Sequence, residues 1–248
     1  MRALILAAGR GSRMRPLSDQ KPKPLLLLAH KSLIAWQIER LRNAGITELV
    51  VNTGWLGAQL PAALGDGSAL GVRIEYSVEP ENAYETGGAI ATALPLLADP
   101  DHAPFIVVSG DIYTDYDYAR LQAAAARIAA DPHATTAHFV LTDNPAHHPG
   151  GDMALGPDDR VRRLGQRLFN YGNIAVFHPA LFAMQPVRQP WKLFPWLYAE
   201  VDAGRVSGEY YSGVWHNIGT PSQLQSLEAE LLAHASHPAV RATSLGLS

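Results

Sequence analysis

Apolar runs suited to buried strands alternate with amphipathic segments along the first part of the chain. Arg2 to Ala8 is a nearly continuous apolar run that ends at Gly9, a pattern typical of a strand buried on both faces in a parallel sheet. Ser32 to Ala44 places apolar side chains at helical spacing behind a serine suited to capping, and Gly45 follows as a stop signal. Because Glu48 to Asn52 is apolar again, this region predicts a strand, a helix and a second strand.

The same alternation continues through most of the chain. Further strands are predicted over Val72 to Ser77, Pro104 to Ser109, Thr135 to Leu141, Ile174 to Phe177 and Val214 to Ile218. Further helices are predicted over Thr86 to Leu97, Asp117 to Ala130, Leu193 to Ala203 and Ser222 to Ala235. Strands that alternate with helices indicate an α/β protein, with a three-layer, Rossmann-like arrangement around a mainly parallel, mixed central sheet.

Two segments break this alternation. Asn144 to Gly151 (NPAHHPGG) is too rich in proline, glycine and histidine for the interior of a helix or strand. We expect it to be an insertion over the edge of the sheet. His237 to Ser248 has the composition of a loose C-terminal tail, so we expect a single domain over residues 1–236.

Composition narrows the classes of function. The chain has 248 residues, of which 47% are hydrophobic and 17% charged, as in an ordinary globular domain. The absence of cysteine excludes thiol catalysis and thiolate metal sites. With 20 Lys and Arg against 23 Asp and Glu, an extended basic surface for nucleic acid is not expected. No apolar run reaches the roughly 20 residues that span a bilayer, so we expect a cytoplasmic protein without a membrane partner.

A glycine-rich loop follows the first predicted strand. Residues 9–14 (GRGSRM) begin like a dinucleotide-binding fingerprint, but Met14 occupies the third glycine position and the acidic residue expected after a second strand is missing. No Gly-Lys-Ser/Thr follows, which excludes a Walker A loop. The backbone N–H groups of such a loop can still reach phosphates, and four cations follow Gly11 in or just beyond it: Arg13, Arg15, Lys21 and Lys23. The alternative is an ordinary strand-to-helix turn with solvated cations.

A longer motif around this loop resembles a known family. Leu6 to Leu26 (LAAGRGSRMRPLSDQKPKPLL) is similar to the L-x-A-A-G-x-G-x-R-x-x-P-L-T…P-K-P-L signature of the sugar-1-phosphate nucleotidyltransferases. The resemblance continues at Thr86 to Ala89, Ser109 to Asp111 and Trp215 to Pro221, so it covers nearly the whole chain. Within the family, Asp143 to Asp152 looks most like the uridylyltransferases that act on N-acetylmuramate α-1-phosphate in peptidoglycan recycling.

The resemblance implies a fold, a reaction and two small-molecule substrates. The fold is that of the nucleotide-diphospho-sugar transferases, with a nucleotide-binding part over about residues 1–118 and a sugar-binding part over about 119–236. An oxygen of a sugar-1-phosphate attacks the α-phosphorus of a nucleoside triphosphate, UTP in the subfamily, and pyrophosphate leaves with the help of Mg²⁺. A phosphate monoester loses its second proton near pH ~6, so no general base is required.

The resemblance assigns roles on the nucleotide side. The backbone of Ala8, Gly9 and Gly11 contacts the base and phosphates. Arg13 holds the departing β- and γ-phosphates and Lys23 reaches the α-phosphate.

Metal binding is assigned to Asp111, which follows a strand at the carboxyl edge where open α/β sheets bind ligands. The family match favours metal binding by Asp111 over a role of this residue in a turn or helix cap. It also favours Asp111 over the nearby Asp115 and Asp117 as the metal ligand. With Arg13 and Lys23, Asp111 is an expected catalytic residue. Asn217 stands where the family usually has a second metal-binding aspartate, and its amide oxygen can ligate Mg²⁺ without adding charge.

The nucleobase is expected to meet residues at the ends of the predicted strands. Glu79 aligns with a position that reads the edge of the base in relatives, where a carboxylate accepts the imino N–H of uracil or thymine. Thr86 and Gly87 are expected to line the base and ribose, unless they merely begin a helix. Asn52 is a weaker candidate.

The sugar side is less well defined, because the usual Glu-Lys-Pro stretch is missing. Lys192 or Arg163 are candidates for the missing cation, and Asn173 for contact with sugar hydroxyls. The neighbours His147, His148 and Asp152 either contact the acyl-amino or lactyl group of the sugar or only order their loop; three-ligand zinc spacing is absent around the histidines.

Other functions stay open at this point. Glucose-1-phosphate thymidylyltransferase and mannose-1-phosphate guanylyltransferase are alternatives within the family. A catalytically silent nucleotide-sugar sensor is an alternative from another class, and Asn217 is the feature that favours it. The sequence predicts no oligomeric state.

Overall fold

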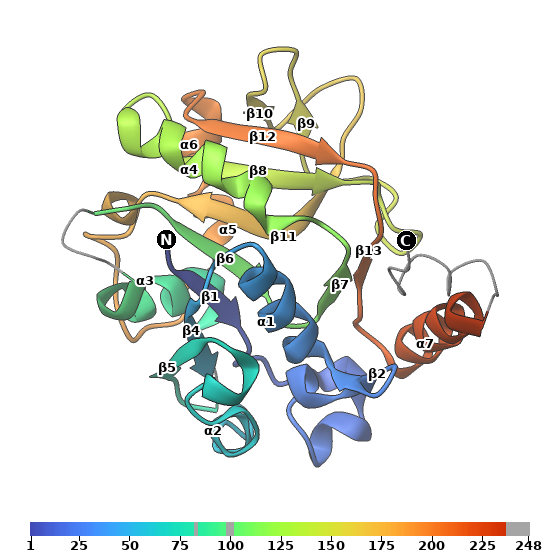
Figure 1. Ribbon diagram of the computed structural model, residues 1–248. Helices are drawn as coiled ribbons and strands as arrows, with labels where there is room; N and C mark the ends of the chain where they lie inside the picture. Colours follow the sequence, from blue (N-terminus) through green and yellow to red (C-terminus); the bar gives the residue numbers. More distant parts are fainter. Residues whose placement is uncertain (82–83, 98–101, 237–248) are drawn as a thin grey trace, which may run out of the picture.

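A seven-stranded sheet forms the centre of the protein in the computed structural model, which describes residues 1–81, 84–97 and 102–236 (Figure 1). Its spatial order is β12-β8-β11-β6-β1-β4-β5. The strands are β1 (Ala3–Leu6), β4 (Glu48–Thr53), β5 (Arg73–Val78), β6 (Phe105–Ser109), β8 (Ala137–Thr142), β11 (Asn170–Phe177) and β12 (Val206–Tyr211). Every neighbouring pair is parallel except those of β11, which runs antiparallel to both β6 and β8. The predicted α/β class and mainly parallel, mixed sheet are confirmed.

Strand β1 owes its continuous apolar sequence to its place in the middle of the sheet. It pairs with β4 on one side, where Ala3 faces Leu49, and with β6 on the other, where Ala3 faces Ile106. Successive side chains of a strand point to opposite faces, and Leu4 and Ile5 accordingly enter two different buried clusters. Both faces of β1 are therefore covered, as the apolar run predicts.

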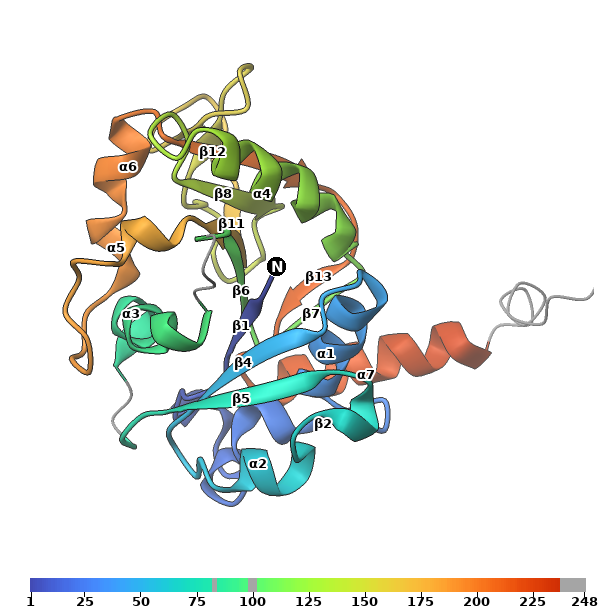
Figure 2. The same ribbon diagram turned by 60° about the vertical axis from the view of Figure 1, so that its left-hand side comes forward.

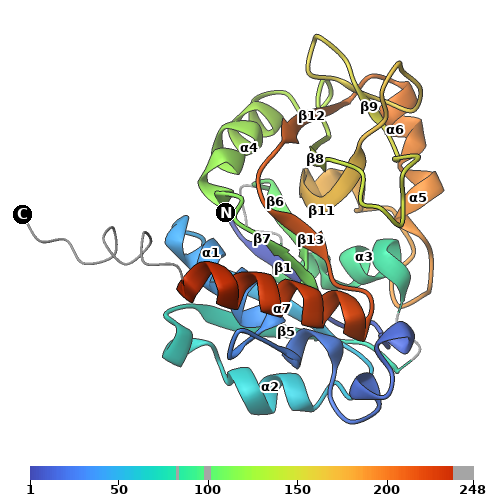
Figure 3. The ribbon, with the colours of Figure 1, turned by 90° about the vertical axis from the view of Figure 1, so that its right-hand side faces the viewer.

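Helices cover the two faces of the sheet and complete three layers. One face carries α1 (Leu33–Asn43), α2 (Gln59–Leu64) and α4 (Leu121–Ala130), and the other carries α3 (Glu85–Leu97), α5 (Leu193–Trp196) and α6 (Tyr198–Asp202). Figure 2 shows α3, α5 and α6 on one side of the strands and α1 and α4 on the other. Helix α7 (Pro221–Ser236) lies outside these layers and packs Leu224 and Leu227 against Met14 and Leu28 (Figure 3). The glycine-rich loop is thus anchored to the last helix through Met14.

Two predicted helices are interrupted. The segment predicted as Asp117 to Ala130 opens with a 3-10 turn, in which the Asp117 carboxylate accepts a hydrogen bond from the Ala119 N–H, and only then continues as α4. The segment predicted as Leu193 to Ala203 forms two short helices, α5 and α6, and it is broken inside α5, where Phe194 adopts an extended conformation before Pro195. A proline disfavours helical geometry in the residue before it, so this break has a local cause.

Short strand pairs lie outside the main sheet. The predicted strand Val214 to Ile218 is β13 (Trp215–Asn217), which pairs antiparallel with β7 (Ile112–Thr114). Two small hairpins complete the set: β2 (Leu27–Leu28) with β3 (Lys31–Ser32), and β9 (Ala154–Leu155) with β10 (Val161–Arg162). The two hairpins, β7, α2 and β12 are not predicted from the apolar pattern.

The two segments that break the sequence pattern differ in outcome. Residues 144–151 contain turns and no helix or strand, as predicted, and they approach α7 where the Gln223 amide nitrogen lies 3.4 Å from Nδ1 of His147. The predicted tail over 237–248 lies outside the described residues. Within the described parts of the chain, no helix combines the length and the apolar character needed to cross a membrane.

Candidate active site

Three adjoining hollows open where β1 and β6 end. The first has a volume of about 510 Å³ and the second and third about 250 Å³ each. Leu6, at the end of β1, lines all three. The first hollow shares Gly9 and Asp111 with the second, and shares Thr86 and Ser109 with the third. They therefore form one cleft along the carboxyl edge of the parallel strands, where α/β sheets bind ligands.

An ion pair marks the border between the first and second hollows. Nζ of Lys23 lies 2.5 Å from Oδ2 of Asp111, and the side chains are 10% and 30% exposed respectively. Asp111 follows β6 through Gly110, whose N–H donates to the Leu6 carbonyl at 2.9 Å. Lys23 opens a 3-10 turn between Pro22 and Pro24. The structure thus brings together two predicted catalytic residues that are 88 positions apart.

The glycine-rich loop wraps around Lys23. Gly11 has φ +61°, in the left-handed region that favours glycine, and a Cβ built there would lie 3.1 Å from the Cβ of Lys23. The hydroxyl of Ser18 donates to the Gly11 carbonyl at 2.8 Å and closes the loop. Gly11, Arg13 and Lys23 all line the second hollow. The predicted phosphate loop is therefore folded around the predicted phosphate-binding cation.

Arg13 contributes a second cation to this hollow. Its side chain is exposed, and its guanidinium carbon lies 3.4 Å from where a Cβ at Gly219 would stand. It forms no ion pair with any residue that the structure describes. Gly219 follows β13, so the chain after Asn217 helps to enclose the second hollow. An unpaired cation beside Lys23 suits an anionic ligand with several charges.

Trp55 holds the glycine-rich loop from the other side. Its backbone N–H donates to the Ala8 carbonyl at 3.1 Å, and its indole N–H donates to the Ser18 carbonyl at 2.8 Å. The guanidinium carbon of Arg10 lies 4.3 Å from the centroid of its ring, a cation–π contact. Arg10 also lines the first hollow. Neither Trp55 nor Arg10 is predicted from the sequence as a site residue. The position of Arg10 between Gly9 and Gly11 could have indicated that it lies at the site.

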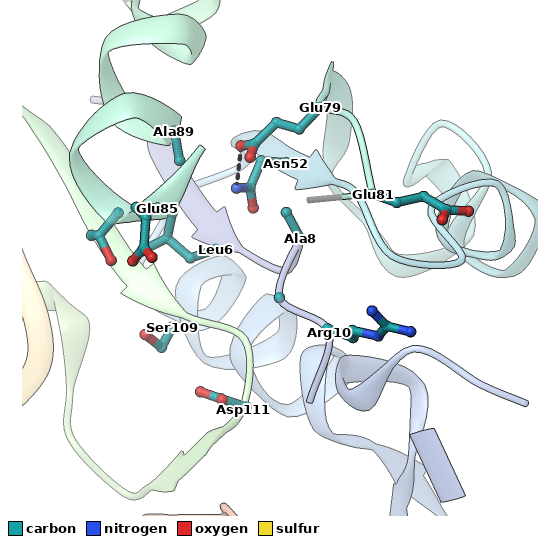
Figure 4. A pocket seen from close by; sticks show the side chains of 12 residues that line it. Leu6, Ala8, Arg10, Asn52, Glu79, Glu81, Glu85, Ala89, Ser109 and Asp111 are labelled. Atoms are coloured by element: carbon teal, nitrogen blue, oxygen red, sulfur yellow. Dashed lines mark hydrogen bonds between the residues drawn. The ribbon is translucent and has the colours of Figure 1, made fainter. Parts of the chain in front are cut away.

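Asn52 and Glu79 form a buried hydrogen-bonded pair at the far wall of the first hollow (Figure 4). The Asn52 amide donates to Oε1 of Glu79 at 2.7 Å, while its own oxygen accepts the Ala7 N–H at 2.5 Å. Oε2 of Glu79 accepts the Tyr84 N–H at 2.7 Å. Burial raises the pKa of Glu79, and the hydrogen bonds from Tyr84 and Asn52 oppose that rise. Asn52 thus holds the chain just after β1, and Glu79 holds Asn52 in place; contact of Glu79 with a base stays a prediction.

The third hollow contains three of the predicted site residues, Thr86, Asn173 and Lys192. Tyr171 and Phe194 line it as well, with ring centroids 5.7 Å apart. These two aromatic residues were missed, because they come from distant segments that only the fold places together. Glu85 and Ser109 line both the first and third hollows, and Glu81 lines the first (Figure 4). Glu85 precedes Thr86 and Ser109 lies two residues before Asp111, so closeness in sequence to a predicted site residue could have indicated both.

Several predicted residues line none of the three hollows. Oδ2 of Asp152 accepts the Tyr171 N–H at 2.8 Å, and Oδ1 lies 3.0 Å from Nε2 of His148, so this aspartate ties its loop to β11. Arg163 pairs with Asp202 at 3.2 Å beside a separate surface hollow.

Gly87 is buried in α3, where it permits close packing rather than lining the cleft. Its N–H donates to the Trp191 carbonyl at 3.1 Å, and a Cβ built there would lie 2.2 Å from the Trp191 ring. Gly87 therefore acts on the cleft indirectly, through the segment that carries Trp191.

Asn217 lies beside Asp111 along the backbone but faces another hollow. It pairs with Ile112 in the β13–β7 ladder, and the Ile218 N–H donates to the Asp111 carbonyl at 3.2 Å. The lining of a fourth hollow of about 280 Å³ includes Asn217 and His147 and excludes Asp111. Over residues 1–81, 84–97 and 102–236, no three His, Asp or Glu side chains cluster closely enough to hold a metal ion.

The two alternative carboxylates near Asp111 are engaged elsewhere. Asp115 accepts hydrogen bonds from the Tyr211 hydroxyl and from the Val214 N–H, the latter at 2.8 Å. Asp117 caps the turn before α4 through the Ala119 N–H. Neither lines the three hollows, so Asp111 is the one of these three aspartates that faces the cleft.

Gly88→Ala is expected to destabilise the fold by ~1–3 kcal/mol, the usual range for overpacking. A Cβ at Gly88 would lie 2.0 Å from the Gln189 carbonyl oxygen, so the segment that carries Lys192 would have to move. This loss outweighs the gain of up to ~1 kcal/mol that alanine offers over glycine within a helix. Chemical denaturation of the two proteins measures the difference. Gly150→Ala, where a Cβ meets nothing within 4 Å, is the control; equal stability of both variants would contradict the prediction.

Comparison with known proteins gives concordant results. The family model described as nucleotidyl transferase matches residues 2–165. The N-acetylmuramate alpha-1-phosphate uridylyltransferase of Neisseria meningitidis serogroup B is 46% identical, over 95% of this chain and 99% of that protein. The protein of the same name from Caulobacter vibrioides is 35% identical, over 92% and 96%. A Bacillus anthracis structure assigned to glucose-1-phosphate thymidylyltransferase, in complex with sucrose, has a TM-score of 0.78 at 19% identity and covers 93% of this chain and 94% of its own. The last match shows the fold alone.

Proposed function

Because the chain belongs to the nucleotidyl transferase family, we propose that it transfers a uridylyl group from UTP to N-acetylmuramate α-1-phosphate and releases pyrophosphate. The product is a nucleotide sugar of peptidoglycan recycling, made in the cytoplasm. Two relatives whose names state this activity match nearly the full length of the chain. The structural observation that carries the proposal is the Lys23–Asp111 pair at the border of two hollows, with Arg13 across the second.

Each hollow suits one part of the two substrates. The second hollow, with backbone N–H groups of the glycine-rich loop and two cations, takes the triphosphate. The first hollow takes the base and ribose beside Asn52 and Glu79, and the third takes the sugar. The first hollow is lined by residues up to Asp111, whereas Asn173 and Lys192 of the third come later in the chain. The sugar-binding part proposed over about residues 119–236 thus contributes to the third hollow, together with Leu6, Glu85, Thr86, Val107 and Ser109 of the nucleotide-binding part.

The chemistry needs neutralisation of charge more than proton transfer. The attacking phosphate oxygen is largely ionised at neutral pH, because its second pKa is near ~6. Lys23 meets the α-phosphate between the two reactants, and Arg13 stabilises charge on the departing pyrophosphate. Pro22 and Pro24 stiffen the loop and hold Lys23 in place, so the loop does not have to lose conformational entropy at the moment of reaction.

The donor set at Asp111 fits Mg²⁺. Mg²⁺ prefers oxygen ligands and is usually held by one or two carboxylates together with substrate phosphates. Asp111 offers one carboxylate that lines both the first and second hollows, whereas Asn217, on the neighbouring strand, lines the fourth hollow and adds no charge. Mg²⁺ bound there would neutralise phosphate charge. With a single carboxylate, Asp111 relies on the phosphates to complete the site.

Asn217→Asp is expected to lower the Mg²⁺ concentration at half-maximal rate, because it adds one negative charge on the strand that neighbours Asp111 and so raises the attraction for the proposed metal. The side chains are nearly isosteric, so sugar preference is expected to stay unchanged. Titration of the initial rate against Mg²⁺ for the two proteins measures the shift. Ser226→Asp, which adds the same charge on α7 within the fourth hollow, controls for a general effect of charge. A changed KM for the sugar with the same Mg²⁺ dependence would place Asn217 at the sugar instead.

The proposed reaction is tested by pyrophosphate release. We expect release with UTP and N-acetylmuramate α-1-phosphate at a higher kcat/KM than with GTP and mannose-1-phosphate or with dTTP and glucose-1-phosphate. Preference for either of the latter pairs would assign one of the two other family activities. Binding of nucleotide and sugar without release of pyrophosphate from any pair would indicate a sensor instead of an enzyme.

A further inference from the structure

The backbone that leads into Lys192 is held at a fixed place beside the third hollow. The preceding Trp191 donates its N–H to the Tyr84 carbonyl at 3.1 Å, and its carbonyl accepts the N–H groups of Gly87 and Gly88 at 3.1 and 3.2 Å. These three hydrogen bonds pin the backbone before Lys192 to the start of α3. The two glycines allow that approach, because a Cβ at either one would overlap the 189–191 backbone or ring.

The charge of Lys192 has no partner within the described chain. Among the described residues that line the third hollow, Lys192 is the only cation. Its ammonium group forms no hydrogen bond or ion pair with any residue in the described ranges. Glu85 lines the same hollow, yet it is not within ion-pair distance. Lys192 is exposed and lines the hollow together with Tyr171 and Phe194, so its charge is available to an anionic group supplied by the ligand.

The phosphates of the substrates are met elsewhere in the cleft. Lys23 and Arg13 line the second hollow, which shares only Leu6 with the third. A cation in the third hollow therefore faces a different end of the sugar phosphate. N-acetylmuramate α-1-phosphate carries a carboxylate on its lactyl group, remote from the phosphate. In an inference that rests on the proposed function, we propose that Lys192 binds this lactyl carboxylate. Lys192 thereby selects N-acetylmuramate over N-acetylglucosamine, which lacks the lactyl group.

Asn173 also lines the third hollow and offers a polar contact for the sugar. The register of β11 with β8 is interrupted between Tyr171 and Ala175, and Asn173 within this irregularity has φ +57°. Bulges of this kind re-aim side chains, and asparagine tolerates the left-handed conformation better than most residues. The Asn173 side chain lines the hollow and has no hydrogen bond to another residue of the described chain. It is free to meet a hydroxyl or the acyl-amino group of the same sugar.

The inference is tested by measuring the binding of two sugar phosphates by calorimetry. Wild-type protein and Lys192→Met are titrated with N-acetylmuramate α-1-phosphate and with N-acetylglucosamine α-1-phosphate. Loss of a charge-assisted contact is expected to raise the Kd for the first about 10- to 100-fold and to change the Kd for the second less than about 3-fold. Lys31→Met, on β3 and paired with Glu39 outside the cleft, is the matched control and is expected to bind both sugars as the wild type does.

Each other outcome contradicts the inference in a recognisable way. Equal weakening for both sugars would place Lys192 at the shared phosphate, and no weakening would remove it from the sugar site. Wild-type protein that binds both sugars equally would also overturn the inference. Failure of the proposed function is separate: it appears as absence of pyrophosphate release by wild-type protein with UTP, whatever Lys192→Met does to sugar binding.

Discussion

Asp111→Ala is expected to lower the rate of pyrophosphate release at least ~100-fold, the usual cost of removing a principal charge contact in the transition state. Asp111 is the partner of Lys23 and lines both the first and the second hollow, between the proposed places of the two reactants. Its side chain lies in a turn after β6 and not in the apolar core, so we expect the fold to persist. Single-turnover release of pyrophosphate measures the rate, and circular dichroism checks the fold.

Two further variants separate charge from packing. Asp111→Asn keeps an oxygen that can accept the Lys23 hydrogen bond but removes the negative charge, and we expect a comparable loss of rate. Asp117→Asn removes a charge six residues away that serves as a cap outside the cleft, so it is expected to keep most of the activity. More than about a tenth of the wild-type rate in Asp111→Asn would show that the carboxylate charge is not the principal contact.

The sheet was predictable because its central strands are buried on both faces. The apolar runs that became β1, β4 and β6 need no knowledge of their partners to be recognised. Strand β12 lies at the edge of the seven-stranded sheet, where β8 is its neighbour, and its sequence VSGEYY carries polar residues and a glycine. Such a strand has no continuous apolar run, so the pattern gave no sign of it. The break at Phe194 within α5 was readable in principle from Pro195.

The nucleotide side of the cleft was predictable because one continuous motif carries most of it. Gly11, Arg13 and Lys23 come from a single loop, and the structure places all three on the second hollow. The sugar side is assembled from segments that are far apart in sequence. The bulge in β11 and the packing of the 189–191 segment on Gly88 bring Tyr171 and Lys192 together, and neither feature leaves a local signature.

Asp152 illustrates the limit of reading chemistry from residue type. A carboxylate beside two histidines suggests a contact with substrate, but in the fold its two oxygens meet His148 and the Tyr171 N–H. The sequence allowed both possibilities, that Asp152 binds the sugar or that it orders its loop. These hydrogen bonds give Asp152 a structural role. Because one of them holds the backbone of Tyr171, which lines the third hollow, this role affects the shape of that hollow.

Lys23→Met is expected to lower kcat/KM for UTP at least ~100-fold, because it removes the cation placed where charge moves between the two reactants. The methionine side chain is similar in length to lysine and apolar, so it fills the space below Gly11 without supplying charge. Steady-state and single-turnover rates of pyrophosphate release measure the loss. Lys31→Met is the matched control outside the cleft and is expected to keep wild-type kinetics.

Lys23→Arg tests whether charge alone is sufficient. The position is buried, with Gly11 and Asp111 close on two sides, and a planar guanidinium cannot replace a compact ammonium there without moving the loop. We therefore expect Lys23→Arg to recover little of the activity that Lys23→Met loses. The kinetic constants decide the role of Lys23: a fall in kcat places its contact in the transition state, whereas a raised KM at unchanged kcat would assign it to binding of UTP in the ground state.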